Sequence, residues 1–192
     1  MRKSTWAMAA GLAGAGLLAA GCQLTRAGYA SAPYRTLHRD GGYEVRDYPA
    51  LRLVETRTGG GDFMRLFRYI DQRNEAGRKI AMTTPVFMQP GRPAGETMAF
   101  VLPEDLPTPP APLDDAVRLT ELPPQRVAVL RFRGRRESSG EVTTRLREWI
   151  SRQGLTAAGA PLVGYFDPPW IPGFLRRNEV MIPTRPDALP AR

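Results

Sequence analysis

Residues 43–61 read YEVRDYPALRLVETRTGGG, and residues 117–134 read VRLTELPPQRVAVLRFRG. The two stretches follow one pattern at an offset of 74 residues, which aligns Pro49 with Pro123, Arg52 with Arg126, and Gly60 with Gly134. Each stretch predicts a short strand, a turn marked by proline, and a longer strand that ends at glycine. The chain is therefore predicted to contain an internal duplication, and this duplication decides the fold.

A helical pattern follows each copy. Residues 62–74 place apolar side chains at helical spacing after Asp62, a predicted N-cap, and residues 138–153 do so after Ser138. Two further strands are predicted to close each half, over residues 85–89 and 97–102 and over residues 161–166 and 178–183. Five prolines in residues 103–116 indicate a linker between the halves.

The predicted fold class is α+β, with two repeats over residues 43–102 and 117–183 in one domain over residues 37–186. Antiparallel strands from both repeats are expected to form one sheet or a distorted barrel, with the two helices packed outside. The only cysteine, Cys22, leaves no disulfide to support this fold, so packing alone must hold it.

The first residues have the layout of an export signal. Arg2 and Lys3 precede an apolar run of about 15 residues, which is short for a membrane-spanning helix and ends in small residues. Residues 18–22 (LAAGC) resemble the lipobox of bacterial lipoproteins, in which the signal is cut before a cysteine that then carries lipid. The alternative is an ordinary signal peptide that ends near a cysteine.

We predict a lipoprotein signal peptide over residues 1–21, a lipidated Cys22, a tether over residues 22–36, and a short tail over residues 187–192. The lipid anchor would hold the protein on a membrane of the cell envelope. In a Gram-negative host the expected location is the outer membrane, facing the periplasm.

The net charge of +8 comes from 27 basic and 19 acidic residues, and the basic ones are scattered arginines for the most part. Export and the lack of a basic cluster longer than residues 131–136 argue against a nucleic-acid partner. A solvated basic surface is expected, with room for one site that binds an anionic small molecule.

Catalytic motifs are absent from the sequence. His38, the only histidine, lies in a polar run (TLHRDGG) predicted to be a loop, so the usual multi-histidine metal sites are excluded. The three glycines at residues 59–61 precede a helix but lack the lysine and the serine or threonine of a phosphate-binding loop. We therefore predict that the protein is not an enzyme.

Residues 164–183 (GYFDPPWIPGFLRRNEVMIP) suggest a binding loop. Prolines keep its first part out of regular structure, yet it carries Trp170, Ile171 and Phe174, followed by Arg176. Apolar side chains on a stiff loop beside guanidinium groups suit a flat hydrophobic ligand with acidic substituents. The alternative is that the aromatic side chains cover one end of the barrel.

Three motifs, in this order, resemble the SOUL heme-binding protein family: YEVRDY (residues 43–48), KIAMTTPV (residues 79–86) and GYFDPPWIPGFLRRNEV (residues 164–180). The resemblance extends over residues 40–184. It implies a distorted antiparallel barrel of about eight strands flanked by two helices. It also implies that Ile80, Met82 and Val86 are mainly core residues and that Pro85 marks the entry to a strand.

The resemblance further implies non-covalent binding of heme or a related tetrapyrrole, in a cleft between the first helix and the C-terminal loop. The residues that would line it are Met64, Arg65, Phe67, Arg68, Trp170, Ile171, Phe174 and Arg176. Arginines at its rim would pair with the propionates.

Two positions depart from the family pattern. Asp47 stands where some members have a histidine proposed to bind iron, and Ile171 stands where some have a lysine. The resemblance therefore assigns no axial iron ligand at position 47, and the nearby His38 is the substitute candidate. The chain is more similar to members that hold heme mainly by apolar contact.

The first hypothesis is thus a lipid-anchored domain that binds a tetrapyrrole as a carrier, buffer or sensor. The second is a small-molecule hydrolase that uses glutamate and tyrosine in the cleft, with Tyr69, Tyr165 and Glu179 as the candidates. The third is an envelope interaction module without a small ligand.

Overall fold

The computed structural model describes residues 28–89, 96–135, 138–168 and 170–185. The predicted signal peptide, Cys22 and the predicted tail lie outside these residues. None of the helices in the described part has the length and apolar character needed to cross a bilayer. The elements are, in chain order, β1 (Ala30–Ser31), β2 (Arg35–Asp40), β3 (Tyr43–Tyr48), β4 (Leu51–Arg57), α2 (Asp62–Ile70), β5 (Thr83–Thr84), β6 (Val86–Gln89), β7 (Thr97–Val101), β8 (Val117–Leu122), β9 (Gln125–Arg133), α3 (Ser139–Arg152), β10 (Leu162–Tyr165), η2 (Gly173–Leu175) and β11 (Arg177–Thr184).

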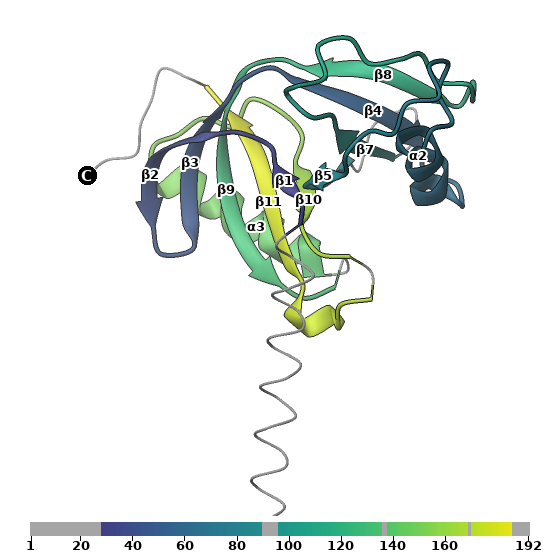
Figure 1. Ribbon diagram of the computed structural model, residues 1–192. Coiled ribbons are helices and arrows are strands. Elements are labelled where there is room, and N and C mark those ends of the chain that lie inside the picture. The colour runs from purple at the N-terminus through teal and green to yellow at the C-terminus, as the bar shows by residue number, and fades with distance from the viewer. Residues whose placement is uncertain (1–27, 90–95, 136–137, 169, 186–192) are drawn as a thin grey trace, which may run out of the picture.

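Nine strands form one antiparallel sheet in the order β2-β3-β9-β11-β10-β6-β7-β4-β8. Figure 1 shows this sheet curled into an open half-barrel, with α3 behind the half that contains β9 and β11 and α2 beside the other half. The predicted α+β fold with two flanking helices is confirmed. The sheet has one strand more than the resemblance implies because β2 adds to its edge.

The two repeats exchange their first strands. Strand β3 of the first repeat pairs with β9 of the second, and β8 of the second repeat pairs with β4 of the first. Strands β6 and β10, one from each repeat, join the two halves of the sheet. Each half of the sheet therefore contains strands from both repeats, and neither repeat forms its own half alone.

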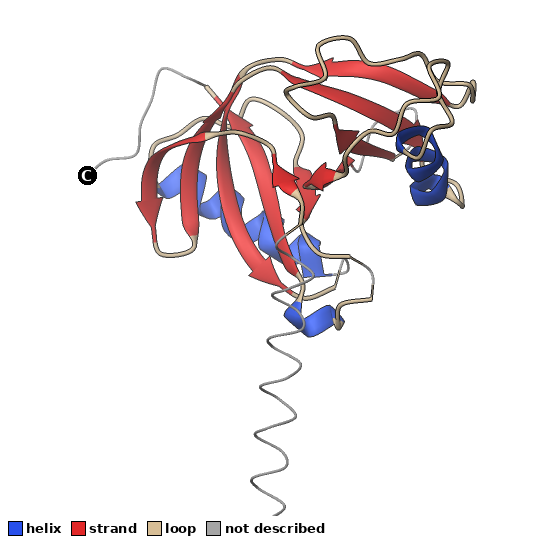
Figure 2. Ribbon diagram, in the orientation of Figure 1, coloured by secondary structure: helices blue, strands red, loops and turns tan. Residues whose placement is uncertain are grey.

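Both helices pack on the convex face of the sheet. Helix α3 buries Val142, Leu146, Trp149 and Ile150 in one core cluster, and helix α2 buries Leu66, Tyr69 and Ile70 in another. A third cluster lies on the concave face and combines side chains of β4, β7 and β9 with Phe87 and Met181. Removing such a side chain from water contributes about 1.5–3 kcal/mol, so the sheet is stabilised from both sides. Figure 2 shows the helices in blue and the strands of the sheet in red.

Helix α2 begins where the pattern predicts but ends four residues earlier, at Ile70 instead of Asn74. The buried Asn74 side chain donates to the carbonyls of Tyr69 and Arg78 and accepts from the Arg78 amide, and these bonds hold a turn. Gly61, not Asp62, occupies the N-cap position. The Asp62 carboxylate instead accepts a hydrogen bond from the Gly59 amide at 3.0 Å.

The chain joins the fold earlier than the predicted tether allows. Strand β1 pairs in parallel with β5, and strand β2 covers the polar run that contains His38, so the prediction of a loop there was wrong. Polar residues form a strand here because β2 lies at the exposed edge of the sheet. In the KIAMTTPV motif, Ile80 is buried and Met82 and Val86 pack against the same core cluster, as the resemblance implies.

Candidate functional site

Helix α2 forms one wall of a groove of about 510 Å³, and residues 112–117 form the other. Three arginines line it: Arg65, Arg68 and Arg73. The Nε atom of Arg65 lies 3.1 Å from a carboxylate oxygen of Asp114. Arg68 and Arg73 are exposed, and neither of them forms an ion pair with another of the described residues. The groove therefore presents three cationic side chains, the carboxylates of Asp114 and Asp115, and the apolar side chain of Leu113.

Met64 and Phe67 stand exposed on α2 next to this row of arginines. The ring of Phe67 lies 6.2 Å from that of Phe63, which contacts the buried ring of Phe100 at 5.3 Å. The exposed aromatic ring is thus supported from the core beneath it. The four predicted site residues of α2, namely Met64, Arg65, Phe67 and Arg68, are all at least partly accessible on one short helix.

The four predicted residues of the C-terminal loop lie elsewhere. Trp170 and Phe174 are exposed, Ile171 is buried, and the Nε of Arg176 donates to the Ile171 carbonyl at 2.8 Å. Figure 1 shows η2, which carries Phe174, beyond the ends of β9 and β11, whereas α2 lies at the other side of the molecule. The structure does not bring the helix residues and the loop residues into one cleft.

A buried charged cluster, which sequence reasoning missed, occupies the concave face. Arg46 has no exposed surface. Its Nη1 and Nη2 atoms donate to the two carboxylate oxygens of Glu179 at 2.7 and 2.8 Å, and its Nε donates to Glu44 at 2.7 Å. Arg131 adds a second guanidinium within 3.1 Å of Glu179. Every charge in this cluster is therefore paired.

Contacts within the cluster set the protonation states of Arg46 and Tyr48. Burial alone lowers the pKa of the Arg46 guanidinium, but hydrogen bonds and charges from Glu179 and Glu44 outweigh burial, and the pKa is raised. The Tyr48 hydroxyl accepts a hydrogen bond from Arg46 at 3.2 Å. Burial raises the pKa of the Tyr48 hydroxyl, the positive charge of Arg46 lowers it by a smaller amount, and the resulting pKa is about 12. Tyr48 is therefore neutral at physiological pH.

The N-terminal segment, residues 30–34, crosses the concave face over this cluster. The Ala32 amide donates to the Thr84 carbonyl at 2.7 Å, and the Ala32 side chain is buried. The ring of Tyr34 lies 4.1 Å from the guanidinium carbon of Arg46 and 5.3 Å from the ring of Tyr48. We call residues 30–34 the strap, because Tyr34 in this segment covers the guanidinium of Arg46.

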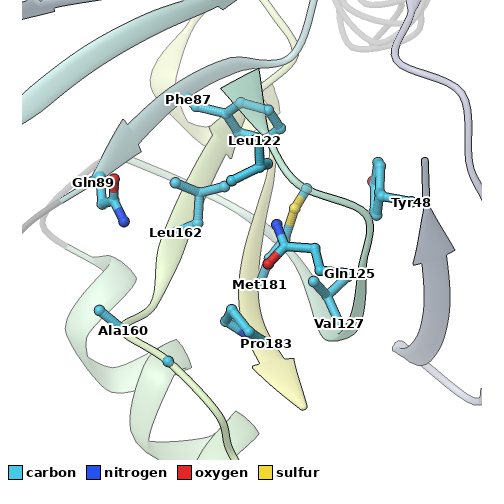
Figure 3. Close-up of a pocket in the computed structure, with 11 residues that line it drawn as sticks. Tyr48, Phe87, Gln89, Leu122, Gln125, Val127, Ala160, Leu162, Met181 and Pro183 are labelled. Atoms are coloured by element: carbon cyan, nitrogen blue, oxygen red, sulfur yellow. The ribbon is translucent and has the colours of Figure 1, made fainter. Parts of the chain in front are cut away.

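Beside the strap, the concave face holds an apolar pocket of about 150 Å³ (Figure 3). Its walls include Phe87, Leu122, Leu162 and Met181, with Gln125 among the few polar groups. A volume near 150 Å³ accommodates a molecule the size of benzene, whereas pockets for larger ligands measure about 300–1,000 Å³. The pocket is too small for a tetrapyrrole.

The glutamate–tyrosine site of the hydrolase hypothesis is not assembled. Glu179 lies on the concave face, in the Arg46 cluster. Tyr69 lies on the buried face of helix α2, and Tyr165 packs against the core cluster under α3. Both side chains are on the convex face of the sheet. The Tyr69 hydroxyl donates to the Pro110 carbonyl, and burial raises the pKa of Tyr69 to about 12. The sheet thus separates the carboxylate from both tyrosines.

His38 is placed far from helix α2. It lies on β2 at one edge of the sheet, with its ring 6.4 Å from that of Trp149, and α2 packs against β4 and β7 near the other edge. Asp47 binds Arg126 and Arg35, and the hydrogen bond from Arg126 contributes most to lowering the pKa of its carboxyl. Among the described residues, no group of three or more histidine, cysteine, aspartate or glutamate side chains is arranged to hold a metal ion.

Comparisons with solved structures support the fold. The C-terminal domain of EcmrR superposes with a TM-score of 0.57 at 11% identity, covering 79% of this chain and 98% of that domain. An uncharacterized conserved protein from Listeria innocua gives 0.55 at 9% identity, covering 74% and 92%. A hydrolase from Listeria innocua gives 0.52 at 9% identity, covering 77% and 94%. At such identities the similarity concerns the fold alone.

A search of curated proteins finds no significant match. The sequence model of the SOUL heme-binding protein family, by contrast, matches residues 29–183. This range contains all the strands from β1 to β10, both helices, and the part of β11 up to Pro183. The chain therefore belongs to the SOUL heme-binding protein family.

Proposed function

We propose that this protein binds heme or a related tetrapyrrole non-covalently at helix α2 and acts as a carrier, buffer or sensor at the membrane. The observation that carries the proposal is membership of a heme-binding family across the whole described domain. The groove beside α2 supports it, because its volume of about 510 Å³ lies within the usual range for ligand sites.

The residues at α2 fit the two chemical characters of heme. The macrocycle is flat and apolar, and the exposed Met64 and Phe67 offer it soft and aromatic contacts. The propionates are anionic, and Arg65 and Arg68 offer them charge-assisted hydrogen bonds. Heme, when bound, supplies redox and gas-binding chemistry at its iron. The protein's own residues would hold and orient it.

The test is a heme titration of residues 23–192, followed by absorbance. These residues retain the entire described fold. A saturable one-to-one change of the Soret band is expected for the wild type. Replacing two arginines, in Arg65→Ala/Arg68→Ala, is expected to weaken binding about tenfold, because two charge-assisted hydrogen bonds are lost.

The matched control is Arg145→Ala/Arg147→Ala, which removes two exposed arginines from the other helix and is expected to leave the titration unchanged. Equal weakening in both variants would mean that only the total charge matters. A wild type with an unsaturating response would remove the support for a tetrapyrrole carrier. Trp170→Ala/Phe174→Ala tests whether the loop residues contribute to the same site.

The membrane part of the proposal rests on the lipobox resemblance of residues 18–22. Mass spectrometry of the protein purified from membranes is expected to show an acylated N-terminal cysteine at Cys22. In Cys22→Ser neither the lipid nor cleavage before residue 22 is expected, so the mass should include residues 1–21 and no acyl chain. An unacylated wild-type chain would contradict the proposed signal.

A further inference from the structure

The loop from residue 166 to residue 176 carries two unusually exposed aromatic side chains. Trp170 is 67% and Phe174 is 73% exposed, more than any other large apolar side chain in the described part of the chain. Large apolar groups that cluster on a surface mark sites of contact with a partner or a membrane. Helix α2, which forms one wall of the groove, lies at another side of the molecule (Figure 1), so the groove does not provide a partner for these two side chains.

The structure of the loop enforces this exposure. Asp167 accepts hydrogen bonds from the backbone amide and the side chain of Arg177, and the Leu175 amide donates to the Pro172 carbonyl at 2.9 Å. Ile171 is buried and anchors the middle of the loop to the domain. The loop is thus fixed by its own contacts, with Trp170 and Phe174 pointing away from the fold.

Two exposed arginines lie near this loop, Arg133 at the end of β9 and Arg135 two residues beyond it. Arg133 is exposed and lies opposite Arg177 in the backbone pairing of β9 with β11. A Cβ on Gly173 would lie 2.9 Å from Cγ of Arg135, so the apolar stem of Arg135 packs directly on the loop backbone. The Asp167 side chain has no exposed surface and adds little negative charge outside. We call Trp170, Phe174, Arg133 and Arg135 the loop patch.

The loop patch lies on the part of the fold that leads to the predicted lipid anchor. Strand β1 pairs with Thr83 and Thr84, and two residues later Val86 pairs with Tyr165, from which the loop departs. Gly28 lies only six positions after Cys22, so the chain between them covers six residue steps. Fully extended, they span at most about 20 Å. A lipid on Cys22 would therefore hold the base of this loop close to the membrane surface.

We propose that the loop patch docks onto the surface of the phospholipid membrane to which the chain is anchored. Trp170 and Phe174 would enter the headgroup region, where amphipathic and aromatic side chains are favoured, and Arg133 and Arg135 would contact anionic headgroups. This inference rests on the proposed anchor at Cys22. A lipid and a second membrane contact together would fix the orientation of the domain, which a single attachment point would leave free.

The test uses unlipidated residues 23–192 with vesicles of phosphatidylethanolamine and phosphatidylglycerol. Residues 23–192 contain two tryptophans, the buried Trp149 and the exposed Trp170, so the emission of Trp170 is expected to shift to the blue on binding. Trp170→Ala/Phe174→Ala is expected to abolish cosedimentation with the vesicles. Arg133→Ala/Arg135→Ala is expected to weaken it about thirtyfold, and phosphatidylcholine vesicles should bind the wild type more weakly.

The matched control is Leu113→Ala/Leu119→Ala, which removes two other exposed apolar side chains. It is expected to bind vesicles like the wild type. No vesicle binding by the wild type, or equal loss in the control and in the aromatic variant, would overturn the proposal. The heme titration contains no vesicles and the vesicle test contains no heme, so failure of one proposal is distinguishable from failure of the other.

Discussion

At the scale of single residues, the Arg46 guanidinium decides whether the concave face is stable. It has no exposed surface and compensates two buried carboxylates, Glu44 and Glu179. Arg46→Ala would leave these charges without their main partner in a site of low polarity. We expect the free energy of unfolding to fall by about 3–5 kcal/mol, measured by urea denaturation.

Two further variants separate this effect from a general loss of charge. Arg35→Ala removes an exposed arginine paired with Asp47 and is expected to cost less than about 1 kcal/mol. The triple change Arg46→Met/Glu44→Leu/Glu179→Leu replaces the buried charged members of the cluster by apolar side chains and leaves the half-exposed Arg131 to water. It is expected to recover most of the stability. If Arg46→Ala were as mild as Arg35→Ala, the cluster would not be buried as described.

The Arg46 cluster also shows a limit of sequence reasoning at this scale. In YEVRDY, the alternation of Glu44, Arg46 and Tyr48 with Tyr43 and Val45 indicates a strand with one polar face, which normally faces water. Here that face is covered by the strap and by the curled sheet. The covering segments are distant in sequence, so the local pattern carries no signal of burial. The sequence shows only that Glu44 and Arg46 in YEVRDY, and Glu179 in residues 178–180 (NEV), are charged residues within two of the family motifs.

At the scale of elements, the strap contains only the two-residue strand β1, which pairs with β5 alone, so its side chains must help to hold it in place. Tyr34 lies over the Arg46 guanidinium and beside the Tyr48 ring. Tyr34→Ala removes one cation–π and one aromatic contact, which together contribute about 1–2 kcal/mol. We expect faster hydrogen exchange at the Ala32 amide, which bonds to Thr84.

Tyr29 provides the matched control for the strap, because both tyrosines are 37% exposed but only Tyr34 makes ring contacts among the described residues. Tyr29→Ala should leave exchange at Ala32 unchanged. Equal effects of the two substitutions would show that the strap is held by its backbone alone.

Most helices and strands could be predicted from the sequence, but which strands pair with each other could not. The apolar spacing of α3 fixes both its position and its buried face, because a helix shows its period within a few turns. The predicted end of α2 was wrong because the side chain of Asn74 bonds to backbone groups and forms a turn. For the candidate site, the resemblance to the family implied four residues of α2, and these side chains are accessible in the structure. The family motifs carry no information about the separation of Trp170 from this helix, which depends on the curl of the sheet.

At the scale of the whole molecule, the exchange of first strands makes the two repeats depend on each other. Without the second repeat, β3 loses β9 and β4 loses β8, so two long edges of the sheet are exposed. Unpaired edges and uncovered apolar faces oppose independent folding. We therefore expect the fragments 28–103 and 104–185 to be largely unfolded when separate and to regain the circular dichroism of the intact domain when mixed.

The alternative to exchanged strands is a simple duplication, and the two arrangements predict different results for the separate fragments. A simple duplication, in which each repeat pairs only within itself, would allow either fragment to fold alone and would leave mixing without effect. In the observed pairing, β3–β9 and β4–β8 account for two of the longest ladders in the sheet, and both connect the repeats. Complementation is also expected to fail in Val129→Pro, because proline in the middle of β9 removes a backbone donor between two paired neighbours. Folding of either fragment alone would show that the repeats are independent units.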